Sequence, residues 1–257
     1  IFLLRKVCNY MNLVLRYKNI LMIIIVLLLF TSIGLSYLEN KCLYDNKIID
    51  KKVQEIKKRP NYIKIENIDE KYLNSVIDIE DHRFYEHGAI DFISILRSII
   101  HNIIAGKVIE GGSTITQQLA KNMCLSNERN LSRKIKELLL SIQLERKYTK
   151  SEILELYVNI ICFGDGYFGI SNASKGYFKK TPCELNFNEA TILAGIPQAP
   201  SIYALSKNNG LAKKRQKQVI RALIKYGNTY KNNKCKYNDD NLLHNIKFNF
   251  HKLAEFV

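Results

Sequence analysis

The amino-acid sequence predicts a mainly α-helical domain that follows an N-terminal membrane anchor. Two observations favour the helical class: apolar residues recur with 3.6-residue spacing in several segments, and strand-like alternation is scarce. An uncharged apolar stretch near the N-terminus predicts the anchor. The chain has 257 residues, of which 47% are hydrophobic and 25% charged, which suits one sizeable domain with an accessory segment.

The anchor is predicted over residues 20–38, which read ILMIIIVLLLFTSIGLSYL and carry no charge. This is about the length that a helix needs to span a membrane. Residues 1–19 contain basic side chains and no acidic one, which predicts a cytoplasmic N-terminus and an extracytoplasmic remainder. A cleaved signal peptide is the alternative, but its apolar core is usually shorter and its cleavage site clearer.

The rest of the chain divides into three parts by composition. Residues 39–66 are polar and lysine-rich, and we expect them to form a stalk between membrane and domain. Residues 67–226 are densely patterned and are predicted to form the folded domain. Residues 227–257 are rich in Lys and Asn, which predicts a polar tail with partial disorder.

Several segments of the domain carry helix signals. Residues 133–148 place apolar side chains at helical spacing. Thr149 lies three residues before Glu152, which is typical of a capping box at the start of the next helix. Further helices are predicted over residues 188–196 and 211–226.

Residues 92–106, FISILRSIIHNIIAG, form an unusually apolar helical stripe. One interpretation is a helix of the protein core, where such side chains are usually found. The other is a helix that dips into the lipid interface, as would suit an enzyme with a lipid-borne substrate. The spacing of the residues leaves both interpretations open.

The net charge of +15 indicates a polyanionic partner, such as nucleic acid, acidic lipid or a phosphorylated substrate. The predicted anchor disfavours nucleic acid, because a basic domain outside a membrane meets anionic lipid headgroups first. The six cysteines include no C-x-x-C pair, so a zinc site is unsupported and buried single thiols are expected.

Acidic residues 80 and 81 lie in a setting that suits catalysis. Glu80 and Asp81 follow an apolar run and precede Phe84 and His87. A carboxyl group among apolar neighbours has a raised pKa, because burial disfavours its charged form. A general base that works near neutral pH requires such a pKa.

Two other stretches offer groups for an anionic ligand. The segment GGSTITQQLAKN at 111–122 places glycines, hydroxyls and amides beside Lys121, and these groups suit phosphate or sugar oxygens. The segment lacks the ending of a Walker A loop. Arg133, Lys134 and Glu137 share one face of a predicted helix, for which spacing alone favours a solvated ion-pair surface.

Together these stretches resemble the peptidoglycan glycosyltransferases of glycosyltransferase family 51, found in class A penicillin-binding proteins and monofunctional biosynthetic transglycosylases. The five family motifs occur in order, across about half the chain. The matching residues are Glu80, Asp81, Phe84 and His87, then 111–122, then Arg133, Lys134 and Glu137, then 153–159, and finally 184–201. The sequence departs from the family pattern at Ala89, at Glu110 and at residues 204–205.

The resemblance implies a lysozyme-like two-lobed helical domain that polymerises lipid II into β-1,4-linked glycan with inversion, releasing undecaprenyl diphosphate. It assigns catalysis to Glu80, as the general base, and to Glu137, which would position cations or hold a metal. Lys121, Arg133 and Lys134 would neutralise the diphosphate, with Mg²⁺ or Mn²⁺ as candidate metals and no organic cofactor. The other residues assigned to substrate binding are Asp81, Phe84, Gly112, Ser113, Thr114, Gln117, Gln118, Asn122, Glu155 and Asn159.

The resemblance also implies a place and partners. The protein would be a single-pass protein of the bacterial cell membrane that meets lipid II, the growing glycan, the membrane, transpeptidases and other cell-wall synthesis proteins, but no nucleic acid. Ser-x-x-Lys and Lys-Thr-Gly motifs are absent, so no transpeptidase activity is expected from this sequence. It would be a monofunctional transglycosylase or the N-terminal piece of a longer protein.

Two other functions stay open at this stage. A glycoside hydrolase of lysozyme type would share the fold class and a catalytic glutamate, but it would not need Lys121, Arg133 and Lys134. A membrane-anchored binding protein that has lost activity would keep the motifs, and the unusual Glu110 leaves room for it.

Overall fold

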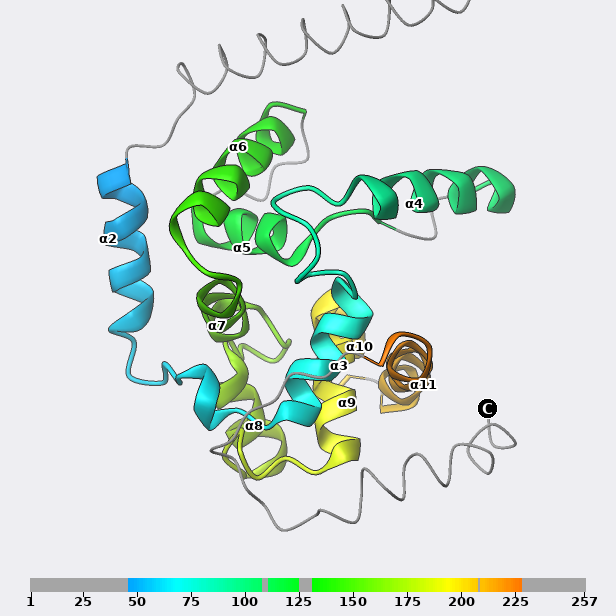
Figure 1. Ribbon diagram of the computed structural model, residues 1–257. Helices are drawn as coiled ribbons and strands as arrows, with labels where there is room; N and C mark the ends of the chain where they lie inside the picture. The colour runs from blue at the N-terminus through cyan, green and yellow to red at the C-terminus, as the bar shows by residue number, and fades with distance from the viewer. Residues whose placement is uncertain (1–45, 108–110, 125–130, 208, 228–257) are drawn as a thin grey trace, which may run out of the picture. The chain divides into compact units, whose positions relative to one another are not determined.

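The computed structural model describes residues 46–107, 111–124, 131–207 and 209–227 (Figure 1). These residues are helical and contain no β-strand, apart from one antiparallel bridge between Cys162 and Phe168. The prediction of a mainly α fold is therefore confirmed. The predicted anchor over residues 20–38 and the tail from residue 228 lie outside the described residues. Within the described ranges, no helix is long and apolar enough to cross a membrane.

The helices follow one another with short connections. In chain order they are α2 (Asn46–Lys57), the 3₁₀ helix η1 (Ile65–Asn67), α3 (Glu70–Glu80), α4 (Phe92–Ala105), α5 (Ile115–Cys124), α6 (Leu131–Lys147), α7 (Lys150–Ile160), α8 (Ile170–Phe178), α9 (Phe187–Gly195), the 3₁₀ helix η2 (Ile196–Gln198), α10 (Pro200–Tyr203) and α11 (Asn209–Tyr226).

Two groups of helices build the core. Helices α3, α9 and α11 pack against one another, and α5 packs on α6 and α7. Buried aliphatic side chains fill both groups, among them Leu73 and Ile77 on α3 and Leu119 on α5. Burying each such side chain contributes about 1.5–3 kcal/mol, so this packing fixes the helices that surround the site described below.

Local signals in the sequence set several helix boundaries. Thr149 and Glu152 form the predicted capping box at the start of α7, in which each side chain meets the other residue's backbone N–H. Asn186 and Glu189 form a second capping box at the start of α9. The helices predicted over residues 133–148, 188–196 and 211–226 correspond to α6, α9 and α11.

Part of the segment expected to be a stalk belongs to the folded body. Residues 46–57 form α2, which packs on α7 and buries Ile49, Val53 and Ile56. The lysines of this stretch dominated its composition, while its three buried aliphatic residues recur at helical spacing. The described part of residues 39–66 therefore lies against the domain instead of extending away from it.

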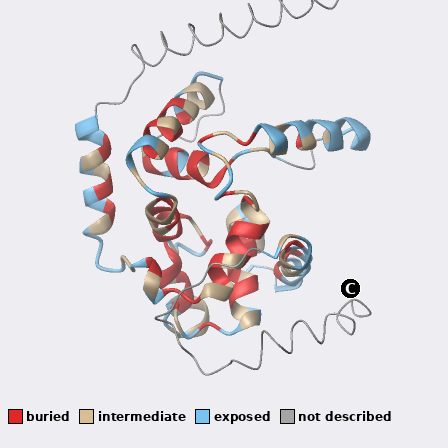
Figure 2. Ribbon diagram, in the orientation of Figure 1, coloured by how far each residue is buried: buried red, intermediate tan, exposed pale blue. Residues whose placement is uncertain are grey.

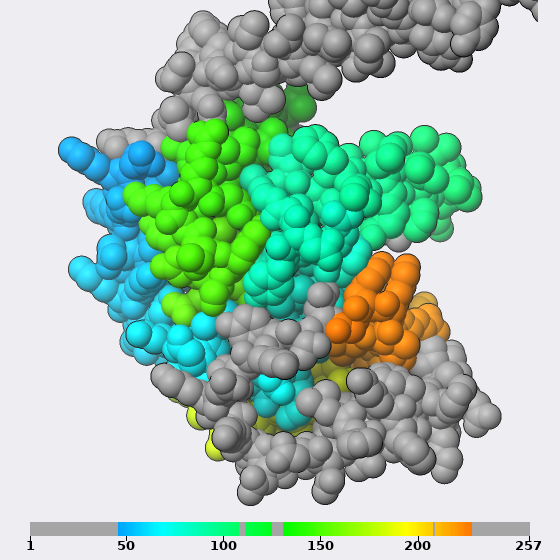
Figure 3. Space-filling model, in the orientation of Figure 1, coloured from blue at the N-terminus to red at the C-terminus, as the bar shows by residue number. Residues whose placement is uncertain are grey.

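Helix α4 differs from the other long helices because its apolar side chains are exposed. Only Ser98 is buried on it, whereas Phe92, Ile103 and Ile104 are 74%, 73% and 80% exposed. Figure 2 shows α4 as mostly exposed, and Figure 3 shows it projecting from the surface beyond its neighbours. The interpretation of residues 92–106 as a core helix is therefore wrong.

The cysteines of the described residues do not share one state. Cys124 and Cys162 have free thiols, as expected, but both are partly exposed and not buried. Partial burial raises the pKa of the Cys124 thiol. Cys183 is disulfide-bonded, so the expectation of single thiols is wrong for this residue.

Candidate active site

A cleft of about 1520 Å³ runs along the domain. Its walls come from α3, α4, α5 and α6, from the loop that follows α7, and from α10 and α11. Segments that are far apart in the sequence therefore meet in one concave surface, which is the usual form of a site for a small molecule or a glycan.

The cleft brings together eight of the fifteen residues that the sequence assigned to the site. These are Glu80, Ser113, Gln118, Lys121, Asn122, Arg133, Lys134 and Glu137. The other seven do not line it: Asp81, Phe84, Gly112, Thr114, Gln117, Glu155 and Asn159.

Glu80 is the last residue of α3, and its carboxyl group faces the cleft. Burial raises the pKa of this carboxyl group, and the hydrogen bond from Gln118 and the charge of Arg215 only partly offset that effect. Gln118 Nε2 donates to Glu80 Oε2 at 2.8 Å, and Arg215 Nη2 lies 3.7 Å from Oε1. A buried carboxyl group with a raised pKa can act as a general base, as the sequence predicted.

A buried tyrosine fixes the orientation of the Gln118 amide. The Tyr157 hydroxyl on α7 donates to Gln118 Oε1 at 3.0 Å, so the Gln118 amino group is turned toward Glu80. Tyr157 is fully buried, which leaves its hydroxyl little freedom to change partner. The chain of contacts therefore holds the Glu80 carboxyl group in one position.

Arg133 and Lys134 are partly exposed and pair with the buried carboxylate of Glu137, so the group is not simply the solvated ion-pair surface that spacing alone favoured. Glu137 is 3% exposed, and Arg133 Nη1 donates to its Oε2 at 2.6 Å. Lys134 Nζ donates to Glu137 Oε1, and also to Ser113 Oγ at 3.0 Å and Gln117 Oε1 at 3.3 Å. The cluster thus joins the first turn of α6 to α5 and presents cations to the cleft.

Both oxygens of Glu137 are already paired with cations, which bears on the predicted metal. A divalent ion at this carboxylate would have to displace Arg133 or Lys134, and cations repel each other at such distances. The arrangement fits a site in which side-chain cations receive an anion directly, and it does not fit a preformed Mg²⁺ or Mn²⁺ site at Glu137.

Asp81, Thr114 and Gln117 hold the start of α5 behind the cleft wall. Asp81 Oδ2 accepts from the backbone N–H of Ile115 at 2.9 Å. Thr114 Oγ1 and Gln117 Nε2 both donate to the carbonyl oxygen of Ala89, at 3.0 and 3.2 Å. Since that contact uses only the backbone of Ala89, the departure from the family pattern at this position leaves it available.

Gly112 and Phe84 are also placed by packing. A Cβ atom added to Gly112 would lie 3.0 Å from Ile95 Cα, so a glycine allows α4 and this loop to approach closely. The Phe84 ring is fully buried, with Lys150 Nζ 4.4 Å from its centroid. Both residues shape the wall without reaching the cleft.

Glu155 and Asn159 on α7 hold the segment that leads into α3. Glu155 accepts from the Tyr62 hydroxyl and, at 2.9 Å, from the backbone N–H of Ile65. Asn159 pairs with the backbone of Ile63, accepting from its N–H at 2.9 Å and donating to its carbonyl at 2.8 Å. The structure places both side chains on this segment, away from the cleft wall.

The loop after α7 forms another rim of the cleft. A Cβ atom added to Gly169 would lie 2.5 Å from Asn159 O, and this glycine has a φ of 80°, so the tight loop requires glycine there. Asp165 accepts from Ser206 Oγ at 2.6 Å and from the Tyr177 hydroxyl at 2.9 Å, and these bonds lower the pKa of its carboxyl group. Phe168, which is 55% exposed, lines the cleft from this loop.

Sequence reasoning missed other cationic residues that line the cleft. They are Arg97 on α4 and Arg215, Arg221 and Lys225 on α11. The helix over residues 211–226 was predicted, but Lys213, Lys214 and Lys217 are equally basic and exposed to solvent. Only the packing of α11 on α3 and α9 decides which of its basic residues face the cleft.

The cleft of this helical domain combines a buried glutamate, which can act as a base, with clustered cations, which can bind an anion. An enzyme that acts on a sugar bearing an anionic group is expected to have such a site. Residues 45–224 match the family model described as transglycosylase, and the chain belongs to this family. The predicted resemblance is thereby confirmed, and the domain is a peptidoglycan glycosyltransferase domain.

Three similar proteins illustrate the relationship. Over 166 residues the chain is 43% identical to penicillin-binding protein 1A of Aquifex aeolicus, covering 65% of this chain and 23% of that protein. Over 179 residues it is 40% identical to penicillin-binding protein 1F of Bacillus subtilis, with coverages of 68% and 25%. Over 189 residues it is 41% identical to penicillin-binding protein 1A/1B of the same species, with coverages of 72% and 21%. The chain thus spans a quarter or less of each relative.

Proposed function

We propose that this protein polymerises lipid II into β-1,4-linked glycan strands, with inversion at the anomeric carbon and release of undecaprenyl diphosphate. The observation that carries this proposal is the shared cleft of Glu80 and the cations Lys121, Arg133 and Lys134. A base and an anion-binding cluster are the two groups that such a transfer needs, one for the attacking hydroxyl and one for the leaving diphosphate.

In the proposed step Glu80 accepts the proton of the acceptor sugar's 4-hydroxyl group. The freed oxygen attacks the anomeric carbon of the donor from the face opposite the diphosphate. The carbon–oxygen bond to the diphosphate then breaks, and the electron pair leaves with the diphosphate. The raised pKa of Glu80 supports this role, because such a carboxyl group holds a proton more readily than an exposed one.

Lys121, Arg133 and Lys134 would receive the negative charge that develops on the leaving diphosphate. Charge-assisted hydrogen bonds from Arg and Lys to phosphate oxygens are stronger than neutral ones. Glu137, held between Arg133 and Lys134, would fix the positions of these two cations. No step in this scheme requires Mg²⁺ or Mn²⁺.

Arg215 is a positioning residue in this proposal. Its side chain is largely buried, and Gly195 leaves the space that its aliphatic part occupies. Its charge favours the ionised form of Glu80 and therefore opposes the effect of burial. We expect Arg215 to keep enough of the Glu80 carboxyl group ionised to accept a proton.

The exposed apolar side chains of α4 would lie in the lipid interface, near the lipid tails of the substrate. With the anchor predicted over residues 20–38, this supports a single-pass protein of the bacterial membrane with an extracytoplasmic catalytic domain. The lysozyme-like two-lobed form and the association with transpeptidases are further parts of the proposal, supported by the family membership.

Polymerisation of purified lipid II by the detergent-solubilised protein tests the proposal. We expect wild type to yield a ladder of glycans on a gel and Glu80→Gln to lose about 10²–10⁴-fold in rate while remaining folded. Glu55→Gln on α2, which changes an exposed glutamate, is the matched control and should polymerise normally. Shortening of added glycan would indicate a hydrolase, and bound lipid II without any product would indicate a binding protein.

A further inference from the structure

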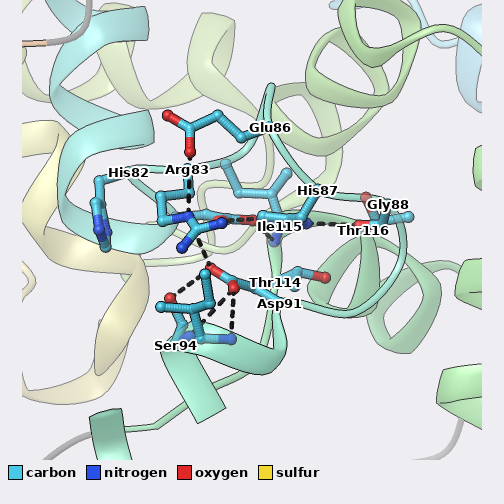
Figure 4. A network of polar contacts seen from close by, with 12 residues as sticks. His82, Arg83, Glu86, His87, Gly88, Asp91, Ser94, Thr114, Ile115 and Thr116 are labelled. Carbon is cyan, nitrogen blue, oxygen red and sulfur yellow. Dashed lines mark hydrogen bonds and ion pairs between the residues drawn. The ribbon is translucent and has the colours of Figure 1, made fainter. Parts of the chain in front are cut away.

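We propose that two histidines on the loop between α3 and α4 are held in opposite charge states and act as positioning residues. His87 is held as an imidazolium and fixes the start of α5, while His82 is held neutral and ties α4 to α11. Figure 4 shows the two side chains on opposite sides of Arg83, within the network of polar contacts around this loop.

Both ring nitrogens of His87 face oxygen atoms that accept hydrogen bonds. Nε2 lies 2.8 Å from Asp81 Oδ1, and Nδ1 lies 2.6 Å from the carbonyl oxygen of Gly88. A carboxylate and a backbone carbonyl can only accept, so each ring nitrogen must carry a hydrogen. A histidine that donates from both nitrogens is the charged imidazolium.

The charge of His87 reaches α5 through Asp81. One Asp81 oxygen accepts from His87 and the other accepts from the backbone N–H of Ile115, the first residue of α5. Asp81 also directly follows Glu80 in the chain. The ion pair therefore links the residue next to the proposed base with the helix that carries Gln118 and Lys121.

His82 shows the opposite arrangement. Arg97 Nη1 lies 3.1 Å from His82 Nε2, and because a guanidinium group can only donate, Nε2 must be without a hydrogen. His82 also makes an aromatic contact: its ring stacks on Tyr226 of α11, with centroids 3.8 Å apart and an interplanar angle of 21°. Neutral His82 thus joins Arg97 of α4 to Tyr226 at the end of α11, and all three residues line the cleft.

The charged groups around the two histidines support these states. The charged groups that affect the pKa of His82 are Arg97 on α4 and Asp81, Arg83 and Asp91 on the loop. Lys225 of α11 lies 5.0 Å from the ring centroid of Tyr226, on which His82 stacks. His87 faces Asp81 on the loop, Lys150 of α7 and, within the same polar group, Asp91. Burial and Arg97 lower the pKa of His82. Burial also acts to lower the pKa of His87, but Asp81 and the carbonyl of Gly88 together outweigh it, so that this pKa is raised.

Opposite charge states define a pH window. The pKa of His87 is raised, so its stabilising contact is complete at low pH and is lost as pH rises through its folded pKa. The pKa of His82 is lowered, so its contact is complete at high pH and is lost as pH falls through its folded pKa. Both contacts coexist between these two values, which lie on either side of the ordinary histidine pKa of about 6.5.

Nitrogen-15 NMR of the full chain in detergent, with labelled histidine, tests this assignment without any substrate. Replacing one histidine at a time assigns the ring signals. We expect His87 to show two protonated ring nitrogens at neutral pH and His82 to show one. A neutral His87, or a charged His82, at that pH would overturn the proposal.

Asp81→Asn tests whether the charge of Asp81, and not only its shape, holds His87 in its charged state. It preserves the shape of Asp81 but removes its charge, so the His87 titration should move to lower pH while the His82 titration stays almost unchanged. An unaltered His87 titration in the folded variant would contradict the assigned ion pair.

The pH dependence of polymerisation, which rests on the proposed function, should show an alkaline limb that follows the His87 titration. An alkaline limb elsewhere would overturn the positioning role of His87, while absence of polymerisation at every pH would count against the function and leave the NMR result standing.

Discussion

Helices α4 and α6 both line the cleft, yet each holds some side chains where their polarity alone would not place them. On α4, aliphatic residues such as Ile103 and Ile104 are exposed. On α6, the carboxylate of Glu137 is buried beside Leu139 and Leu140. The difference shows that the burial of a side chain depends on the groups it contacts as well as on its polarity. Glu137 is paired with two cations, whereas nothing in the described chain covers the apolar face of α4.

The largest expected effect lies in the packed part of α6. Leu140 is fully buried, so Leu140→Ala should lower the free energy of unfolding by about 2–5 kcal/mol through lost contacts and a residual cavity. Chemical denaturation of the detergent-solubilised protein measures this change. A loss below about 1 kcal/mol would mean that α6 is less firmly packed than the structure indicates.

A smaller effect on stability is expected from the buried charge of the same helix. Glu137→Gln keeps the shape but leaves Arg133 and Lys134 without their carboxylate, which should cost about 1–3 kcal/mol. Polymerisation should fall severely, though less than in Glu80→Gln. Turnover equal to wild type would show that Glu137 does not position these cations, whatever its effect on denaturation.

Arg215 on α11 is expected to affect how activity depends on pH. Arg215→Met removes a charge that favours ionised Glu80, so the pKa of Glu80 should rise further. Because the base must be ionised to act, the acidic limb of kcat/KM should move to higher pH, with a severalfold loss on that limb and less at neutral pH. Arg215→Lys, which keeps the charge, is the control, and identical acidic limbs in all three proteins would exclude the proposed role.

The smallest effect on stability is expected on α4. Ile104→Ala removes an exposed side chain and should change the free energy of unfolding by no more than about 0.5 kcal/mol. The same change, combined with Ile103→Ala, should weaken binding to vesicles of anionic lipid, measured by sedimentation. Unchanged vesicle binding together with a large loss of stability would restore the interpretation of α4 as a core helix.

Much of the fold could be predicted where the signal was local. The capping box of Thr149 and Glu152 and the helices over residues 133–148, 188–196 and 211–226 depend on neighbours within a few residues, and the structure contains them all. Helix α2 was missed because its many lysines masked a short set of buried aliphatic residues.

The site could be predicted in part, for a related reason. The motifs contain Glu80, Gln118 and Lys121, which line the cleft, but they also contain Glu155 and Asn159, which hold the segment before α3. A motif records that a residue type is needed at a position, and it does not distinguish contact with a ligand from support of the wall.

The sequence by itself determined the helical class, the family and the presence of a glutamate with cations. Tertiary structure alone decided that Arg215 faces Glu80, that Glu137 is buried and that α4 is exposed. The physical reason is that helical periodicity fixes which residues share a face, whereas burial and pKa depend on which other element that face meets. Such contacts join residues that are distant in the chain, as Glu80 and Arg215 are, and no local pattern encodes them.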